Sequence, residues 1–444
     1  MKYNKYVYWH TDADHFVLYN MYNNEILATN EEIHSLLLKY KNNVEALKNI
    51  HPSLYNELHS KYYIVENDFN ETEELIKKWD NDEKNKQELS LIIIPTLSCN
   101  MSCWYCYEKH DGNLTMSTDI IDSIYRLIND KLQSDSLKKL SINFFGGEPL
   151  LSFKKTCLPI LEYAKGKCIE KDIALSTHFT TNGYLISISM IKELKQLEIP
   201  ISMQITLDGN RDKHNKIRFT KNGENSFDTI VNNIKSLISH KINVNCRLNY
   251  TQDNIYSIAD IIDEFTTTSK DDLKYLNFNM QRIWQDYDSV DLKDEEKTIS
   301  SWFHKECLPL NTSSILSQRH CYADYENSFI INYDGKIFKC TARDFASSTC
   351  DGELTSDGKI LTNKQYNMRM ELKRGGVQCK KCNIYPICHV NCSQFALENK
   401  PKIENNLCLF NYTEEQKQQK IVEQIKLRIQ DAISSLSNAT KAIK

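Results

Sequence analysis

Apolar residues recur along the middle of the chain in short runs that alternate with amphipathic stretches of helical length. The runs with strand character cover residues 91–97, 139–147, 174–183, 200–209, 242–250 and 275–283. Helix-length segments, such as those at 117–133 and 227–239, separate them. Six strand–helix repeats predict an α/β fold with a parallel sheet, here a partial (β/α)6 barrel. Active sites of such barrels collect at the C-terminal ends of the strands.

The first 88 residues have a different pattern. Residues 15–20 and 24–30 predict a hairpin, and Thr29 or Asn30 then caps a helix with acidic residues in its first turn. Two short helices at 44–50 and 52–59 follow, and then a strand in KYYIVEND. This order predicts a small winged-helix-like domain. The charged stretch 71–88 predicts a helical linker.

The C-terminal part is divided by composition. We expect a barrel core over 89–285, an irregular connector over 286–320 and a cysteine-rich domain over 321–412. Few long apolar periods occur in the cysteine-rich stretch, so metal would organise it. The tail 413–444 predicts a charged amphipathic helix, with one side formed by Ile421, Ile425, Ile429 and Ile433.

Charge and hydropathy exclude several functions. The chain of 444 residues has 55 Lys+Arg against 59 Asp+Glu, a net charge of −4, which argues against nucleic acid as a partner. Its longest strongly apolar run, LSLIIIPTL, is far shorter than a membrane span. The N-terminus has no apolar signal-peptide core, so we expect a cytoplasmic protein. Fifteen cysteines in such a protein indicate metal binding rather than disulfides.

Three of these cysteines, Cys99, Cys103 and Cys106, directly follow the first strand in the string CNMSCWYC. Three thiolates at C-x3-C-x2-C spacing can hold three irons of a [4Fe–4S] cube and leave the fourth iron open. A zinc site or buried thiols would also use cysteines. The spacing, with Tyr105 before the third cysteine, resembles the radical S-adenosylmethionine (radical SAM) signature. The resemblance implies a TIM-like partial barrel in which the open iron binds S-adenosylmethionine and Tyr105 lies at the cofactor.

The following strand ends extend this resemblance. The second strand ends in FFGGEPLL, the third in TTNG and the fourth in TLDG, with His214 and Arg218 downstream. The family pattern usually has Ser where Thr206 stands, and Thr keeps the hydroxyl. The resemblance implies that Thr206 contacts the ribose and Arg218 the methionine carboxylate region. The remaining residues that it assigns to S-adenosylmethionine are Gly146, Gly147, Glu148 and Asn182.

The C-terminal cysteines form a second pattern, which resembles the SPASM extension of radical SAM enzymes that modify peptides and proteins. Read alone, residues 379–392 would also suit a zinc ribbon. The resemblance implies two auxiliary [4Fe–4S] clusters, and therefore three clusters in all. One would be held by Cys379, Cys382, Cys388 and Cys408, and the other by Cys321, Cys340 and Cys392. Cys307 is a candidate fourth ligand of the latter, Cys350 is a more distant option, and an open iron is the third possibility.

Three further cysteines lie within helix or strand patterns and predict small buried hydrophobic residues: Cys157, Cys168 and Cys246.

Together these resemblances imply a radical SAM/SPASM maturase of a ribosomally synthesised precursor peptide, which installs a thioether or carbon–carbon crosslink. The leader of the peptide would pair with the hairpin edge at HFVLYN, and a flavodoxin or ferredoxin would supply electrons. The main alternative is an anaerobic sulfatase-maturing enzyme, which forms formylglycine. Two features weigh against it: about 90 residues precede the first cysteine motif, and Thr341 stands where those enzymes have Asp. A non-catalytic leader-binding scaffold is the alternative from another class.

Overall fold

The computed structural model describes residues 1–12, 15–108, 110, 112, 114–286, 291–312, 321–388 and 392–442. For residues 12, 15, 311–312 and 430–442 it describes the backbone alone. Packing divides the chain into two compact units. Unit 1 comprises Met1–Lys84, Ile315–Glu326 and Met368–Lys444, and unit 2 comprises Asn85–Ser314 and Asn327–Asn367.

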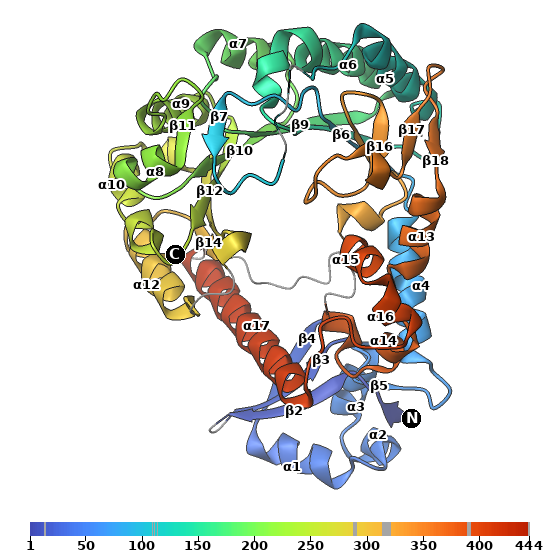
Figure 1. The fold of residues 1–444 in the computed structure, drawn as a ribbon. Coiled ribbons are helices and arrows are strands. Elements are labelled where there is room, and N and C mark those ends of the chain that lie inside the picture. Colours follow the sequence, from blue (N-terminus) through green and yellow to red (C-terminus); the bar gives the residue numbers. More distant parts are fainter. Residues whose placement is uncertain are drawn as a thin grey trace. The chain divides into compact units, whose positions relative to one another are not determined.

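Unit 2 is built around a large sheet, which has eleven strands in the described residues (Figure 1). Six strands pair in parallel in the order β13-β12-β10-β9-β8-β6. They are β6 (Glu88–Ile93), β8 (Lys139–Phe144), β9 (Ala174–Thr181), β10 (Ile201–Leu207), β12 (Asn243–Tyr250) and β13 (Leu276–Arg282). These strands confirm the six predicted from the apolar runs and their parallel arrangement.

The predicted irregular connector at 286–320 is wrong over its described residues. Helix α12 (Lys293–Lys305) buries Ile299 and Phe303 in the main core, and strand β14 (Leu310–Thr312) pairs in parallel with β13. The acidic residues in the first turn of this helix did not suggest that it has an apolar face. Ile299 and Phe303 are four residues apart and therefore lie on one face of the helix.

Part of the cysteine-rich segment also joins this sheet. Strand β15 (Ser328–Ile331) pairs in parallel with β6, and three strands then continue the sheet in antiparallel pairs. They are β16 (Lys336–Phe338), β17 (Gly352–Leu354) and β18 (Ile360–Thr362). Residues 328–362 are therefore organised by backbone pairing to the barrel sheet, a contribution that the cysteine spacing did not reveal.

Helices cover one face of the sheet (Figure 1). They include α5 (Thr118–Lys131), α6 (Leu158–Lys171), α7 (Ile188–Gln196) and α9 (Phe227–Ser239). The strand residues beneath them are buried and mostly apolar, as with Phe179, Met203 and Cys246. Shorter helices of this unit are α8 (Arg211–Ile217), α10 (Ile261–Phe265) and α11 (Lys270–Leu273).

The opposite face of the sheet carries polar side chains that are only half-buried, because side chains alternate between the two faces of a strand. We call it the polar face. Its members on β8, β9, β10, β12 and β13 are Asn143, Ser176, His178, Thr180, Ser202, Gln204, Thr206, Asn245, Arg247, Asn277, Asn279 and Gln281. A closed eight-stranded barrel fills this side with apolar layers. Here the side chains instead suit a polar ligand.

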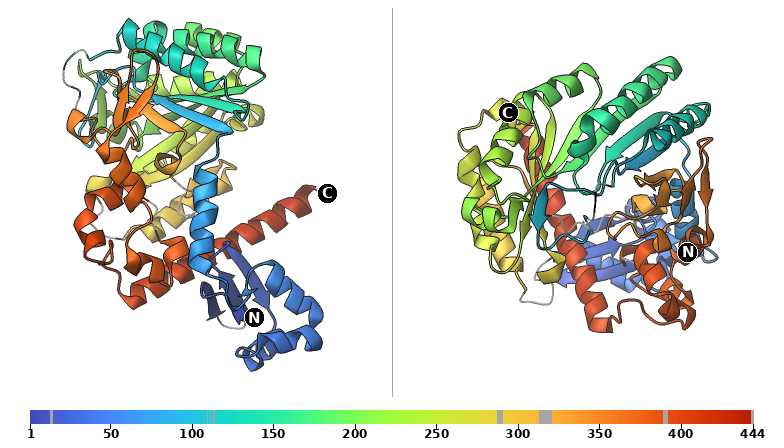
Figure 2. Two further views of the ribbon diagram at one scale, coloured as in Figure 1. Left: turned by 90° about the vertical axis from the view of Figure 1, so that its right-hand side faces the viewer. Right: turned by 45° about the horizontal axis from the view of Figure 1, so that its top comes forward.

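Unit 1 begins with a three-stranded antiparallel sheet in the order β2-β3-β4 and with helices on one side of it (Figure 2). The strands are β2 (Val7–Asp12), β3 (His15–Asn20) and β4 (Glu25–Thr29). The helices are α1 (Glu31–Lys39), α2 (Leu47–Ile50) and α3 (Pro52–Ser60), and β1 (Lys2–Tyr3) pairs with β5 (Ile64–Val65). Asn30 caps α1 as predicted, by accepting a hydrogen bond from the backbone of Ile33.

The predicted hairpin edge at HFVLYN is wrong. This segment is β3, the central strand, which pairs with β2 on one side and with β4 on the other. Leu18 packs against helices α1 to α3, whereas Val17 and Tyr19 pack into the second core of the unit. Strand β2 had not been predicted, and its presence removes the expected edge.

The predicted helix in residues 71–88 is confirmed over 71–83, but its role as a linker is wrong. Helix α4 (Glu71–Glu83) buries Leu75 and Trp79 in a core that includes Cys379 and Tyr385. The predicted C-terminal helix is confirmed as α17 (Glu414–Ala442), with Ile421 and Ile425 fully buried in the same core. The other helices of the segment are α13 (Lys364–Leu372), α14 (Val377–Lys381), α15 (Ser393–Glu398) and α16 (Lys400–Glu404). None of the helices described here is long and apolar enough to cross a membrane.

Candidate active site

The cysteine loop lies at the C-terminal end of β6, where the barrel prediction places an active site. Cys99 and Cys103 are half-buried and Cys106 is exposed. Strand β7 (Met101–Cys103) pairs with β11 (Arg218–Thr220), and this register sets Arg218 directly opposite Cys103. The backbone N–H of Cys106 donates to the carbonyl of Cys103 and closes a turn. Backbone pairing therefore brings the predicted Arg218 next to the predicted cysteines.

A buried network joins Tyr105 to the ends of two strands. The hydroxyl of Tyr105 donates to Asp208 Oδ1 at 2.7 Å, and Arg218 Nε donates to Asp208 Oδ2 at 2.8 Å. Arg218 also donates to the Tyr105 hydroxyl, and Asn249 Nδ2 does so at 3.1 Å. Burial opposes the charge on Arg218, but Cys103, Tyr105 and Asp208 outweigh it and raise the pKa of Arg218 well above its usual value. Arg218 is therefore a permanent cation beside the cysteine loop.

Glu148 is fully buried and connects the ends of β8 and β9. Its Oε1 accepts from the Thr181 hydroxyl at 2.7 Å and from the backbone of Leu150 at 3.0 Å. Its Oε2 accepts from the backbone of Asn182 at 2.7 Å. Burial raises the pKa of Glu148, and these donors act in the opposite direction. The side chain thus holds the GGEP turn against the TTNG turn through protein donors.

The two glycines of the GGEP turn lie against the backbone of the cysteine loop. Gly146 has φ +115°, in a region that L residues rarely adopt. A Cβ on Gly147 would lie 2.4 Å from the carbonyl oxygens of both Leu97 and Ser98. Both positions require glycine because the turn packs directly on the segment that leads into Cys99.

The two remaining predicted residues, Asn182 and Thr206, have different neighbours. Asn182 donates from Nδ2 to Asn100 Oδ1 at 2.8 Å and lies 3.9 Å from Cys99 Sγ, so it belongs to the cysteine loop environment. Thr206 stands on β10, on the polar face, in register with Arg247 on β12. Both residues are thus held at the strand ends where the cysteine loop lies.

Sequence reasoning missed several residues of this site, namely Asn100, Tyr107, Asp208, Arg247 and Asn249. Asp208 belongs to the quoted TLDG string but was given no role. Arg247 and Asn249 are polar residues within a predicted strand, spaced by two, and this spacing places them on one face. That signal was available in the sequence, whereas the hydrogen bond of Asn249 to Tyr105 is a product of the fold.

The chemistry of the three loop thiols fits an iron–sulfur cluster. Within the described ranges, no three Asp, Glu, His or Cys side chains converge on a position for one metal ion. A [4Fe–4S] cube instead distributes its thiolates over separate irons. Burial raises the pKa of the Cys99 thiol to about 12, so the metal-free thiol is protonated at neutral pH. Binding a cluster there would release protons, since metals bind the thiolate.

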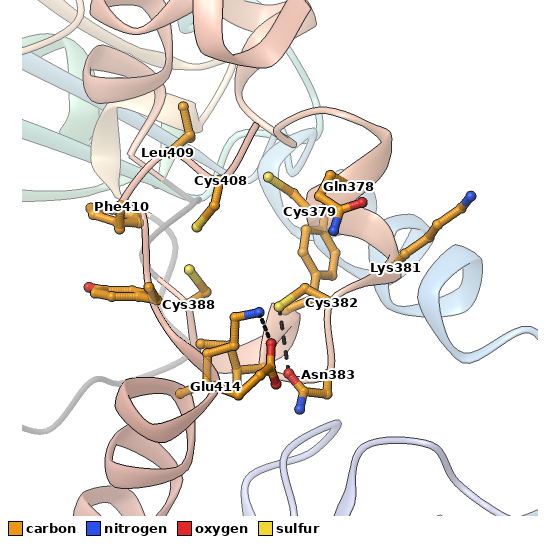
Figure 3. A pocket seen from close by; sticks show the side chains of 14 residues that line it. Gln378, Cys379, Lys381, Cys382, Asn383, Cys388, Cys408, Leu409, Phe410 and Glu414 are labelled. Carbon is orange, nitrogen blue, oxygen red and sulfur yellow. Dashed lines mark hydrogen bonds and ion pairs between the residues drawn. The ribbon is translucent and has the colours of Figure 1, made fainter. Parts of the chain in front are cut away.

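A second group of cysteines surrounds one cavity in unit 1. The cavity has a volume of about 290 Å³ and is lined by Cys379, Cys382, Cys388 and Cys408 (Figure 3). Their sulfur atoms face the same opening (Figure 3), and Lys417 and aromatic side chains also line the cavity. Four thiols directed into one cavity are the donor set that an iron–sulfur cluster requires. The sequence had grouped these four residues together.

The remaining cysteines are distributed over both units. Cys321 and Cys392 belong to unit 1, and Cys340 belongs to unit 2. Cys307 is exposed and has φ +57° at the end of α12. The three cysteines expected to behave as hydrophobic residues are buried in the main core, as predicted: Cys157, Cys168 and Cys246.

Comparison with known families identifies the barrel. Residues 93–263 match the family model of the Radical SAM superfamily. This range begins within β6 and includes the cysteine loop, the GGEP and TTNG turns and the Asp208–Arg218 pair.

Two curated relatives are similar to parts of this chain. The radical SAM cyclopropyl synthase TigE of Paramaledivibacter caminithermalis is 28% identical over 247 residues, which cover 52% of this chain and 48% of TigE. The cysteine-type anaerobic sulfatase-maturating enzyme of Clostridium novyi is 25% identical over 358 residues, covering 72% of this chain and 92% of that enzyme. The chain thus spans about half of the first relative and most of the second.

Solved structures share the fold. The structure described as native anSMEcpe with bound AdoMet has a TM-score of 0.51 at 18% identity, and covers 71% of this chain and 98% of its own. Streptococcus suis SuiB has a TM-score of 0.51 at 17% identity, and covers 90% of this chain and 98% of its own. A further structure shows SuiB bound to its precursor peptide SuiA, with a TM-score of 0.50 at 16% identity over 90% of this chain.

Proposed function

We propose that this chain, a radical SAM superfamily enzyme of the group that includes the sulfatase-maturating enzymes and SuiB, modifies a ribosomally synthesised precursor peptide by an oxidative crosslink. The bond would be a thioether or a carbon–carbon link. A scaffold without catalysis would not need the complete site, with three loop cysteines, the GGEP turn and the Arg218 cation, so we set that alternative aside.

The observation that carries this proposal is the extent of the fold match. SuiB corresponds to 90% of this chain, so only about 44 of 444 residues lack a counterpart. Residues 1–84 alone are more numerous than that, so the match must include part of this segment. The sulfatase-maturating structure covers 71% of the chain. A peptide-bound SuiB structure makes a precursor peptide the substrate class that we infer.

We assign the residues of the site different roles in this proposal. Cys99, Cys103 and Cys106 would hold a [4Fe–4S] cluster, and Tyr105, Gly146, Gly147, Asn182, Thr206 and Arg218 would surround S-adenosylmethionine. When bound, these cofactors supply a 5′-deoxyadenosyl radical that removes a hydrogen atom from the substrate. Asp208 fixes the guanidinium of Arg218, and Glu148 fixes the two turns that border the loop. Holding the target carbon within about 3–3.5 Å of the reacting atom is then a matter of substrate positioning.

The auxiliary cysteines would hold clusters that accept the second electron of the two-electron oxidation. Cys379, Cys382, Cys388 and Cys408 would hold one [4Fe–4S] cluster in their cavity. The other cluster would use Cys321, Cys340 and Cys392, with Cys307 as the candidate fourth ligand. A flavodoxin or ferredoxin would deliver the electrons. Three clusters in all follow from this proposal.

The leader of the peptide would add a strand to the sheet of unit 1. Since β3 is central, the outer edges of β2 and β4 are the ones available, and in the described residues neither edge pairs with another strand. An added strand gains backbone hydrogen bonds from such an edge. Deleting residues 1–88 would not isolate leader binding, because the deletion also removes Leu75 and Trp79 from the core around Tyr385.

Formylglycine formation is the second candidate function. The Clostridium novyi enzyme, matched over 92% of its length, favours it. Against it stands Thr341, at the position where sulfatase-maturing enzymes carry an Asp proposed as a base. Here the backbone carbonyl of Thr341 accepts a hydrogen bond from the Tyr107 hydroxyl at 2.7 Å. This segment therefore contacts the cysteine loop.

The experiment is anaerobic co-expression of the full chain with a short candidate precursor peptide encoded nearby, followed by mass spectrometry. A peptide lighter by two hydrogen atoms, with fragmentation that locates a crosslink, is expected. The variant with Cys99→Ala, Cys103→Ala and Cys106→Ala should leave the peptide unmodified. An unchanged precursor, together with an aldehyde on a sulfatase-derived cysteine peptide, would overturn the crosslink proposal in favour of formylglycine formation.

A further inference from the structure

The polar face is unusual in its chemistry, because it is composed almost entirely of neutral amides and hydroxyls. Five of its members are Asn or Gln on β10, β12 and β13, and the strand register aligns them in rows: Gln204, Asn245 and Asn277 share one row. Primary amides donate and accept at once, and therefore match the alternating N–H and C=O groups of a peptide backbone. Such a surface would bind an extended peptide with little regard to its side chains.

One residue breaks this neutrality. Arg247, in register between Thr206 on β10 and Asn279 on β13, is the cation among the half-buried residues named as members of the polar face. Its Nε donates to Asn249 Oδ1 at 2.8 Å, and among the described residues no carboxylate pairs with it. The Arg247 side chain as a whole is half-buried. Burial of the side chain lowers its pKa.

The position of Arg247 is tied to the cysteine loop. Asn249, which accepts from Arg247, donates in turn to the Tyr105 hydroxyl at 3.1 Å. Tyr105 immediately precedes Cys106. The chain of contacts therefore holds the guanidinium of Arg247 on the same sheet face as Thr206 and next to the cysteine loop.

We propose that Arg247 binds a carboxylate of the peptide substrate, either an Asp or Glu side chain or the C-terminal carboxylate, while the amides of the polar face bind the adjacent backbone. This inference rests on the proposed function and narrows its substrate class to peptides with an acidic group close to the modified residue. A guanidinium binds a carboxylate in a fixed two-pronged geometry, so it would orient the peptide as well as retain it.

The methionine carboxylate of S-adenosylmethionine is the other carboxylate at this site. Arg218 stands opposite Cys103 and is already fixed by Asp208, which makes it the cation expected for the cofactor. The cofactor has one methionine carboxylate, which does not account for both Arg218 and Arg247. The test below measures peptide binding and S-adenosylmethionine binding separately, and so distinguishes the two carboxylates.

The test uses the full chain, reconstituted anaerobically and immobilised, with a display library of short random peptides as the probe. The native protein should enrich peptides that contain Asp or Glu, or that end in a free rather than an amidated carboxylate. Arg247→Gln should abolish this preference and Arg247→Lys should keep part of it. Lys216→Gln, on the exposed side of α8, is the matched control and should select like the native protein.

Selected peptides then give a test that needs no variant. Replacing their Asp by Asn, or Glu by Gln, should weaken binding to the native protein about tenfold, as expected for loss of a charged hydrogen bond. Binding of S-adenosylmethionine, measured in parallel, should be the same for Arg247→Gln and Lys216→Gln.

Three results would overturn the inference: enrichment without any acidic preference, an unchanged preference in Arg247→Gln, or loss of S-adenosylmethionine binding in that variant with the peptide preference intact. Failure of the proposed function looks different, because then no peptide is retained by the native protein although S-adenosylmethionine is still cleaved.

Discussion

The hydroxyl of Tyr107 donates a hydrogen bond of 2.7 Å to the backbone carbonyl of Thr341. Tyr107 directly follows Cys106, and Thr341 directly follows Cys340. The ring of Tyr107 also stacks on Trp284, with an interplanar angle of 12°, and the guanidinium of Arg343 lies 5.7 Å from the centre of the Trp284 ring. Within unit 2, the loop of the first cysteine set is therefore joined to the loop that carries Cys340.

Removing this hydroxyl should loosen the junction between the two loops. We expect Tyr107→Phe to lower the free energy of unfolding by about 0.5–1 kcal/mol, the usual contribution of one hydrogen bond at a partly exposed site. Urea denaturation of the full chain measures it. Tyr184→Phe is the matched control, because its hydroxyl makes a longer bond of 3.3 Å to Glu224. Equal losses in both variants would show that the Thr341 contact contributes nothing of its own.

The close approach of the GGEP turn to the cysteine loop makes a sharper prediction. Gly147→Ala would place a methyl group against the carbonyls of Leu97 and Ser98, so the segment before Cys99 must move. We expect a loss of iron from the first site, about four atoms per chain if one cube is lost. Gly166→Ala is the control, because a Cβ there has no neighbour within 4 Å. Full iron content in Gly147→Ala would contradict the argument.

The control variant Gly166→Ala should itself change the free energy of unfolding. Gly166 lies within α6, where alanine is more favourable than glycine by roughly 0.5–1 kcal/mol. Gly166→Ala should therefore raise the free energy of unfolding while leaving the iron content unchanged.

The six parallel strands of the barrel could be predicted from the sequence because each is a short apolar run followed by a helical period. β14 and β15 to β18 were missed, since strands of three or four residues carry too little periodicity. Segment 15–20 was correctly predicted as a strand but was placed at an edge, because the polar and aromatic residues 7–12 did not suggest the strand that pairs with it.

The site could be predicted only in part for a related reason. Spacing along the chain identifies the cysteines and the strand-end turns, because their positions are local. The contacts of Tyr105 with Asp208 and Asn249 join residues separated by 103 and 144 positions, and no local pattern encodes them. The same holds for Glu148, whose partners on β9 are about 33 positions away.

The Asp208–Arg218 pair should be a large contributor to stability. The side chain of Asp208 is fully buried and that of Arg218 is 10% exposed. Asp208→Asn leaves a buried cation without its counter-charge, for which a cost of about 3–5 kcal/mol is typical. Asp228→Asn removes an exposed partner of Arg211 and should cost less than about 1 kcal/mol. Denaturant titration of both variants measures the difference, and equal costs would refute the buried role.

The cavity of unit 1 predicts where a further cluster binds. Cys408→Ala removes one of the four thiols that face it and should lower the iron content by up to about four atoms per chain. Cys168→Ala removes a thiol buried in the core of the barrel and should leave the iron content unchanged. Equal iron in the two variants, or zinc in place of iron, would exclude an iron–sulfur cluster at this cavity.

His214 predicts how stability depends on pH. It is fully buried, its Nδ1 accepts from the backbone of Asp208 at 3.1 Å, and its Nε2 lies 3.0 Å from the Ser226 hydroxyl. Burial lowers the pKa of His214 from 6.5 to about 4, and the charge of Asp208 acts in the opposite direction. The neutral ring is therefore the form that the folded protein accommodates, with Nδ1 as acceptor and Nε2–H as donor.

The sign of the effect follows from proton binding. Between pH 6.5 and about 4 the unfolded chain protonates this histidine and the folded protein does not. The stabilisation is thus complete above pH 6.5, decreases as the pH falls, and is lost near pH 4, with a total of about 3 kcal/mol. Glu108, whose pKa burial raises to about 7, contributes with the opposite sign in this window, so the native curve alone is not diagnostic. The measurement is therefore the difference between the native protein and His214→Gln in denaturant titrations at several pH values. A difference that stays constant from pH 7 to pH 4 would show that His214 does not titrate in this way.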